Sequence, residues 1–130
     1  MGLYYKSTRN SNLKVTASEA ILKGLAPDGG LFVPSELPKL DVTMSDLKGK
    51  TYQEIAYLVM KQFLTDFTEE ELKNCIDKAY DSKFDTEEIA PLVKVDDTYY
   101  MELFHGATIA FKGTFYPATS DDNFGKEERR

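Results

Sequence analysis

The side chain best suited to covalent chemistry in this sequence is a lysine that follows a short apolar run. Lys112 comes directly after Ile109, Ala110 and Phe111. An amine with the ordinary pKa of about 10.4 is protonated at neutral pH, so it needs apolar surroundings or a nearby positive charge before it can attack a carbonyl group. The three preceding residues could provide such surroundings. By residue type alone, a solvated surface lysine is the more frequent case.

The single histidine and the single cysteine are the other candidates. His105 precedes Gly106, which permits a close backbone approach at a tight bend. His105 is either a hydrogen-bonded structural residue or an acid–base group, because the sequence does not place a carboxylate beside it. Cys75 can form no internal disulfide and lies on an apolar helical stripe, which favours a small buried hydrophobe over a catalytic thiol. One histidine and one cysteine are too few for a dedicated transition-metal site, so none is expected.

A polar run near the start of the chain offers donors for an anion. Ser7, Thr8 and Arg9 carry hydroxyl and guanidinium groups, which suit a phosphate. The same residues equally suit the polar end of a strand, and the sequence predicts a strand over Leu3 to Thr8. Both interpretations remain open.

The elements that would position these residues begin with three helices. Each is predicted from a threonine followed three residues later by a glutamate, a pair that satisfies free N–H groups at a helix start. The pairs are Thr16 with Glu19, Thr51 with Glu54, and Thr68 with Glu71. The first helix should stop at Gly24 in a left-handed conformation. The third is amphipathic and packs on a core through an apolar stripe. Its members are Leu72, Cys75, Ile76, Ala79 and Tyr80.

Strands are predicted on either side of the helices. A turn over Pro27 to Gly30 precedes a short strand over Leu31 to Val33, which Pro34 should end. Leu92 to Val95 and Thr98 to Leu103 read as a hairpin around two aspartates. The order of strand, helix, strand, two helices and hairpin predicts an α/β fold class.

The composition limits the classes of function. The chain of 130 residues is 42% hydrophobic and 29% charged, which is typical of one compact globular unit. A net charge of −6 and a pI near 4.8 disfavour nucleic-acid binding. No apolar run approaches the roughly 18 residues of a membrane span, and the start has no hydrophobic signal core. We therefore expect no membrane or nucleic-acid partner and a cytoplasmic location.

Three stretches of the sequence together resemble one enzyme family. Glu102 to Lys112 reads Glu-Leu-Phe-His-Gly-Ala-Thr-Ile-Ala-Phe-Lys, and Tyr5 to Arg9 reads Tyr-Lys-Ser-Thr-Arg. Glu19 to Pro34 contains Gly-Leu-Ala-Pro-Asp-Gly-Gly-Leu-Phe-Val-Pro. These runs resemble the signatures of threonine synthase, a family of pyridoxal-phosphate enzymes. The resemblance covers about the first 112 residues.

The resemblance implies a fold, a reaction and site residues. It implies a small N-terminal α+β domain of a fold-type II pyridoxal-phosphate enzyme, with Lys112 as the catalytic residue that forms a Schiff base with the cofactor. Phe111 and His105 would contribute to the cofactor pocket, and Ser7, Thr8 and Arg9 to substrate binding. The full-length enzyme, a carbon–oxygen lyase acting on phosphates, would convert O-phospho-L-homoserine and water to L-threonine and phosphate, a step of threonine biosynthesis.

The tail departs from the family pattern after Lys112. The family continues with an apolar helix resembling Ala-Leu-Ser-Ile-Leu-Pro-Leu-Leu-Met-Thr-Thr-Ser-Ala. Suitable codons for that peptide, read two bases later, encode Thr114 to Gly125. We therefore expect a frameshift, either genuine or from sequencing, with residues 1–112 as the family's N-terminal domain, including the start of the segment that contains the cofactor lysine, and residues 113–130 as a non-native, disordered tail. Such a chain would be truncated at the start of the cofactor-binding lobe and inactive by itself.

Two other functions remain as alternatives. A non-enzymatic module could bind an intact homologue or another subunit through its uncovered surface. A small acidic interaction domain unrelated to cofactor chemistry is supported only by composition. The sequence leaves the oligomeric state open.

Overall fold

The described residues, 2–111 of a computed structural model, form two compact units rather than one. The first unit contains residues 2–48 and 56–73, and the second contains residues 49–55 and 74–111. The buried side chains are divided between these two units. The first set is Val15, Ala17, Ala20, Ala26 and Leu72. The second set is Ile76, Ala79, Tyr80, Phe84 and Ile89.

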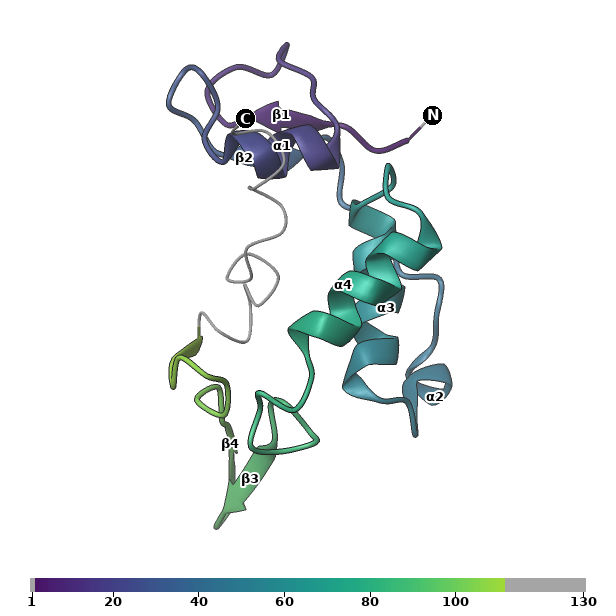
Figure 1. The fold of residues 1–130 in the computed structure, drawn as a ribbon, viewed down its shortest axis with the longest axis vertical. Helices are drawn as coiled ribbons and strands as arrows, with labels where there is room; N and C mark the ends of the chain where they lie inside the picture. Colours follow the sequence, from purple (N-terminus) through teal and green to yellow (C-terminus); the bar gives the residue numbers. More distant parts are fainter. Residues whose placement is uncertain (1, 112–130) are drawn as a thin grey trace. The chain divides into compact units, whose positions relative to one another are not determined.

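In the first unit, a short antiparallel ribbon joins the polar run to a turn. Strand β1, Tyr5–Ser7, pairs with β2, Phe32–Pro34, in a register that places Ser7 opposite Phe32 (Figure 1). Strand β2 therefore begins one residue later than predicted and includes Pro34. Leu31 instead makes an isolated bridge with Leu25, which closes the turn between them. A proline is tolerated here because a two-stranded ribbon consists only of edge strands.

Helix α1, Ala17–Lys23, has both of its predicted ends, with one difference in geometry. Thr16 and Glu19 form the predicted capping box. The helix stops at Gly24, whose φ of 69° is positive as expected but whose ψ of −71° lies outside the left-handed helical region. The N–H of Leu25 donates to the carbonyl of Lys23 at 2.8 Å. The end of α1 is therefore a tight three-residue γ-turn.

The helices that follow have the same kind of N-terminal cap. Helix α3, Tyr52–Phe63, follows Thr51, and helix α4, Glu69–Ala79, follows Thr68. In both, the threonine N–H donates to the glutamate three residues later at 2.8 Å. A further short helix, α2 or Met44–Leu47, was not predicted from the sequence and has a capping box of Thr43 and Asp46. It was missed because the partner is an aspartate and the helix has too few residues to show a period.

The stripe predicted on α4 faces two different cores. Leu72 is buried in the first unit, and Ile76, Ala79 and Tyr80 are buried in the second. Cys75 is half-buried, in agreement with a packing role. In the second unit, the ring of Tyr80 lies 4.8 Å from that of Tyr52 and 6.0 Å from that of Phe84. The stripe therefore contributes to both units, as core packing requires.

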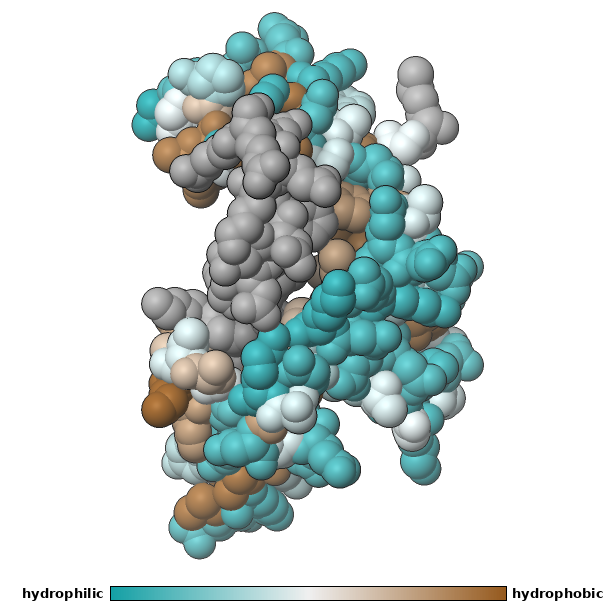
Figure 2. Space-filling view, in the orientation of Figure 1, coloured by the Kyte–Doolittle hydropathy of each residue, from teal (hydrophilic) through white to brown (hydrophobic). Residues whose placement is uncertain are grey.

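The predicted hairpin is present in the second unit and has exposed apolar side chains. Strands β3, Leu92–Val95, and β4, Thr98–Met101, pair around a turn in which Asp96 has a φ of 52°. Every residue of both strands is exposed. Figure 2 shows brown, apolar atoms gathered on this hairpin. Its exposed apolar members are Leu92, Val93, Val95, Tyr99, Tyr100 and Met101. The described part of the chain is thus an α+β arrangement of helices and antiparallel ribbons, as the family resemblance implies.

Candidate functional site

The segment that follows β4 contains two of the candidate site residues, His105 and Phe111. It runs from Glu102 to Phe111, and Lys112, next in sequence, lies outside the described residues. The N–H of Glu102 donates to the carbonyl of Pro91 at 3.0 Å, which continues the pairing of the hairpin. Beyond it, the N–H of Asp85 donates to the carbonyl of His105 at 3.2 Å. Two backbone bonds thus tie the start of this segment to the residues between α4 and β3.

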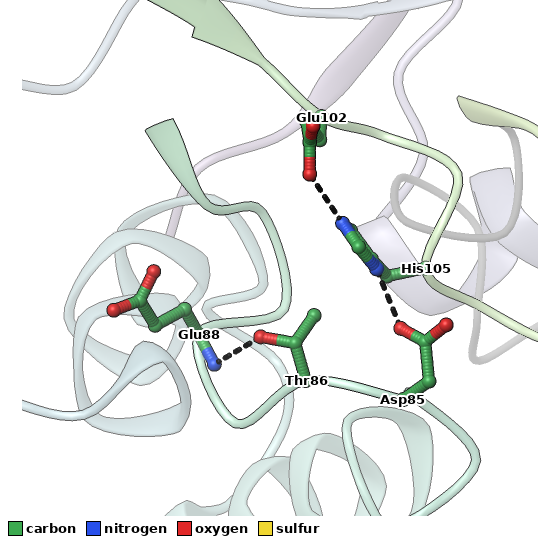
Figure 3. A network of polar contacts seen from close by, with 5 residues as sticks. All are labelled: Asp85, Thr86, Glu88, Glu102 and His105. Carbon is green, nitrogen blue, oxygen red and sulfur yellow. Dashed lines mark hydrogen bonds and ion pairs between the residues drawn. The ribbon is translucent and has the colours of Figure 1, made fainter. Parts of the chain in front are cut away.

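His105 lies between two carboxylates. Its Nδ1 is 2.5 Å from Oδ1 of Asp85, and its Nε2 is 2.8 Å from Oε2 of Glu102 (Figure 3). The His105 side chain is 15% exposed, compared with 74% for Asp85. The ring of Phe104 lies 4.6 Å from the imidazole. We call Asp85, Glu102 and His105 the histidine clasp, because the imidazole joins two separate segments.

The clasp favours the protonated form of the imidazole. The hydrogen bond to Glu102 is the largest influence and raises the pKa of His105 above 6.5, and the hydrogen bond and charge of Asp85 act in the same direction. Partial desolvation opposes them. A neutral imidazole has only one N–H, whereas the imidazolium can donate to both carboxylates. In this arrangement, both ring nitrogens are engaged within the protein.

The residues after the clasp make a close turn and then become exposed. Gly106 is buried, and a Cβ at this position would lie 3.0 Å from Cε1 of Phe84. The N–H of Ile109 donates to the carbonyl of Gly106 at 2.9 Å. Ile109 has a positive φ of 51°, an uncommon conformation for a β-branched residue. The side chains of Ile109 and Phe111 are 77% and 62% exposed. Two of the three apolar residues before Lys112 are therefore largely exposed.

An open cleft borders the clasp on the side of Asp85. Its volume is about 880 Å³, and its walls include Tyr52, Tyr80, Phe84 and Asp85. Burial raises the pKa of Tyr80, so its hydroxyl stays protonated at neutral pH. None of the described residues 102–111 lines this cleft. The cleft is therefore separate from the apolar run that leads to Lys112.

The polar run near the start makes internal hydrogen bonds in the first unit. Ser7 is buried, and its hydroxyl donates to Oδ1 of Asp28 at 2.7 Å. Thr8 accepts from the N–H of Leu31 at 3.1 Å, and Arg9 donates from Nη1 to the carbonyl of Asp28 at 3.0 Å. These bonds support the interpretation of a polar strand end that holds a turn. The exposed Arg9 keeps donors for an anion, so substrate binding by Ser7, Thr8 and Arg9 stays a prediction.

Comparison with known proteins identifies the family. A family profile described as "Threonine synthase N terminus" matches residues 4–80, which is more than half of the chain. The chain belongs to the threonine synthase family. The threonine synthase of Schizosaccharomyces pombe is 42% identical over 112 residues, and that of Saccharomyces cerevisiae is 36% identical over 118 residues. Each match covers 83% of this chain.

Solved threonine synthases have the same fold in the matching region. The structure of pyridoxal-phosphate-bound threonine synthase from Brucella melitensis superposes with a TM-score of 0.76 at 35% identity and covers 86% of this chain. The yeast threonine synthase structure gives a TM-score of 0.75 at 36% identity over 85% of this chain. The fold expected from the resemblance is thereby confirmed.

The chain spans about a quarter of these relatives. It covers 22% and 23% of the two fungal proteins, and 25% and 23% of the two solved chains. Among the described residues, no helix has the length and apolar character needed to cross a membrane. In the same part of the chain, no cluster of histidine, cysteine, aspartate or glutamate side chains is arranged to hold a metal ion.

Two members of the histidine clasp were not selected from the sequence. Glu102 precedes His105 by three residues, but without a helix this spacing predicts no contact. Asp85 is twenty residues away and reaches His105 only because the loop after α4 lies beside the segment after β4 (Figure 3). The sequence contains many carboxylates, and nothing in it distinguishes Asp85 and Glu102 from the others. The contact itself required the structure.

Proposed function

We propose that this chain supplies the N-terminal part of a pyridoxal-phosphate-dependent threonine synthase. The complete enzyme is a carbon–oxygen lyase that converts O-phospho-L-homoserine and water to L-threonine and phosphate. The observation that carries the proposal is the likeness to a cofactor-bound threonine synthase over 86% of this chain, at a TM-score of 0.76. The motif from Glu102 to Lys112 supports the same assignment.

The residues near Lys112 suit the cofactor. Lys112 would hold pyridoxal phosphate covalently, and the bound cofactor would supply an electron sink for the reacting carbons. The exposed apolar side chains of Ile109 and Phe111 would reduce the hydration of the amine once further protein covers them. In its free form, the Lys112 amine would carry a proton between substrate carbons. Both ring nitrogens of His105 face carboxylates, so His105 would contact a cofactor through its ring without a hydrogen bond from either nitrogen.

The chain by itself is proposed to be inactive. Its relatives are about four times longer, and the sequence contains no recognisable cradle for the cofactor phosphate and no partner for the pyridine nitrogen. The frameshift account of residues 113–130 concerns positions outside the described residues and stays a prediction that resequencing of the gene tests. A cytoplasmic location likewise stays a prediction from the sequence.

A chimeric enzyme tests the proposed function. Residues 1–112 would replace the matching N-terminal region of the Schizosaccharomyces pombe enzyme, and release of threonine and phosphate would be measured. We expect activity in the chimera and none in the 130-residue chain. Lys112→Ala should lower the chimera's activity by at least about a hundredfold. Lys39→Ala, at an exposed position in the first unit, is the matched control. A stable, correctly folded chimera that is inactive, or one in which both variants behave alike, would refute the assignment.

A non-enzymatic interaction module is the second candidate, and the exposed apolar hairpin β3–β4 favours it. Under this function, the chain forms a stable complex with an intact homologue in a pull-down and forms no active chimera. The enzyme function requires no such complex. The activity of the chimera therefore distinguishes the two candidates.

A further inference from the structure

The histidine clasp connects two segments that are distant in sequence. Asp85 belongs to the loop after α4, whereas Glu102 and His105 belong to the segment after β4. The side-chain contacts are 2.5 Å and 2.8 Å long, and the backbone bond from Asp85 to His105 is 3.2 Å long. In Figure 3 the imidazole stands between the two carboxylates, with one ring nitrogen facing each of them. The contacts fix both the position and the plane of the ring.

The protonation of the ring decides how many of these contacts are hydrogen bonds. An ionised carboxylate only accepts, so each of the two contacts needs an N–H on the imidazole. The imidazolium has two such groups and the neutral ring has one. In this arrangement, a neutral ring would leave one nitrogen lone pair directed at an anionic oxygen. The geometry therefore fits the charged form, and it leaves His105 no acceptor nitrogen with which to act as a base.

The segment beyond the clasp is anchored near its start. Gly106 is buried against Phe84, whereas Ala107, Thr108 and Ile109 are exposed. Since these exposed residues gain little from burial, the contacts at Glu102, His105 and Gly106 help to set the path of the chain toward Lys112. A small displacement there would move the residues that follow.

We propose that Asp85 and Glu102 are positioning residues, which act through the imidazolium of His105 to hold the segment that leads to Lys112. The effect on Lys112 rests on the proposed function, whereas the clasp itself does not. Neither carboxylate is proposed to touch substrate or cofactor. Their role is to keep the backbone of residues 102–111 on the loop that follows α4.

The clasp makes this positioning dependent on pH. Among the described residues, the ionisable groups in contact with the imidazole are Asp85 from the loop and Glu102 from its own segment; Phe104 contributes an uncharged ring. The pKa of His105 is raised by these carboxylates. The contribution to stability is therefore complete below the unfolded pKa and is lost as the pH rises through the folded pKa. Alkaline conditions should loosen the segment.

The first test is the titration of His105 by NMR in the 130-residue chain. It is the only histidine in the sequence, so its imidazole signal needs no further assignment. We expect a pKa above 6.5 that falls toward 6.5 in Asp85→Asn and in Glu102→Gln. The matched controls are Asp97→Asn, in the hairpin turn, and Glu88→Gln, whose side chain points away from His105 (Figure 3). Controls should leave the titration unchanged. A wild-type pKa at or below 6.5 would overturn the clasp, even if a variant failed to fold.

The second test measures Lys112 in the chimera by incubation with pyridoxal phosphate, borohydride reduction and peptide mapping. We expect Asp85→Asn and Glu102→Gln to lower labelling of Lys112 severalfold, with Asp85→Glu restoring part of it. Equal labelling in all variants would overturn the positioning role while leaving the proposed function intact. Absence of labelling in the wild-type chimera would overturn the positioning role together with the proposed function. The NMR titration would then still decide whether the clasp exists.

Discussion

At the scale of single residues, the internal bonds of the first unit explain why particular side chains occupy the polar run and the turn beside it. Asp28 accepts from the hydroxyl of Ser7 at 2.7 Å and from the N–H of Gly30 at 2.9 Å. Ser7 also accepts from the N–H of Arg9 at 3.1 Å. The residue types of this run were evident from the sequence, but their partners were not. A Ser-Thr-Arg stretch is compatible with an anion site or a turn, and only the position of Asp28 shows which bonds are made.

A methyl group at Gly30 should destabilise the first unit by steric conflict. A Cβ there would lie 2.1 Å from Oγ of Ser7. We expect Gly30→Ala to lower the free energy of unfolding by about 1–3 kcal/mol, measured by urea denaturation. In the Gly30→Ala/Ser7→Ala double variant, the second change should cost less than Ser7→Ala alone. Additive effects of the two changes would contradict this account.

A control for this prediction is Gly49→Ala, where a Cβ would meet no atom within 4 Å although φ is 80°. We expect Gly49→Ala to lower the free energy of unfolding by about 1 kcal/mol, because alanine at a positive φ is strained. The cost of Gly30→Ala should therefore exceed that of Gly49→Ala. A smaller effect at Gly30 would show that the turn adapts to the added methyl group.

The carboxylate of Asp28 should make the stability of the first unit sensitive to acid. The hydrogen bond from Ser7 lowers the pKa of Asp28 below 3.8, with a further contribution from the N–H of Gly30. This stabilisation is present above the unfolded pKa and is lost as the pH falls through the folded pKa. We expect the difference in unfolding free energy between wild type and Asp28→Asn to shrink below pH 3.8. Urea titrations across acidic pH values would measure it, and a constant difference would be inconsistent with this role.

At the scale of elements, the local sequence was sufficient to predict where helices start, but it was not sufficient to predict which distant residues they pack against. The three threonine–glutamate pairs are capping boxes because the two bonds lie within one turn of chain and need no distant residue. The hairpin was predicted for the same reason. The end of α1 at Gly24 was predicted, but its γ-turn was not, since glycine permits several conformations with positive φ. The division into two units depends on long-range packing, which composition cannot indicate.

The capping box of α4 should contribute measurably to stability. Thr68 accepts from the N–H of Glu71 at 3.3 Å and its own N–H donates to Glu71. We expect Thr68→Ala to lower the unfolding free energy by about 1 kcal/mol, as measured by thermal or urea unfolding. Thr43→Ala removes an equivalent box from α2, a helix of 4 residues with no buried side chain, and should have a smaller effect. A larger loss of stability in Thr43→Ala than in Thr68→Ala would show that α4 is stabilised by packing alone.

At the scale of the whole molecule, the family is established and the activity of the complete protein is proposed. The motifs in the first 112 residues were sufficient to identify threonine synthase from the sequence, because their order and length are specific. Lys112 is expected from the motif and stays a prediction. The contact of Asp85 with His105 joins distant segments and could not be predicted from the sequence.

The exposed hairpin should behave differently in the isolated chain and in a complete enzyme. Val93 and Tyr100 are opposite each other in β3 and β4 and are 39% and 55% exposed. Replacing both with threonine should reduce binding of the dye ANS by the 130-residue chain without loss of helical circular dichroism. In the chimera, the same replacements should lower the stability by removing apolar contacts. An unchanged chimera would show that further protein does not cover this hairpin.

The most direct measurement of the central claim is the identity of the lysine that binds the cofactor. The chimera carrying residues 1–112 would be incubated with pyridoxal phosphate, reduced with borohydride and digested, and the modified peptide identified by mass spectrometry. The account predicts one dominant modified residue, Lys112, and loss of that modification in Lys112→Arg. Modification spread over the exposed lysines, with Lys112 no more labelled than Lys39, would contradict the account.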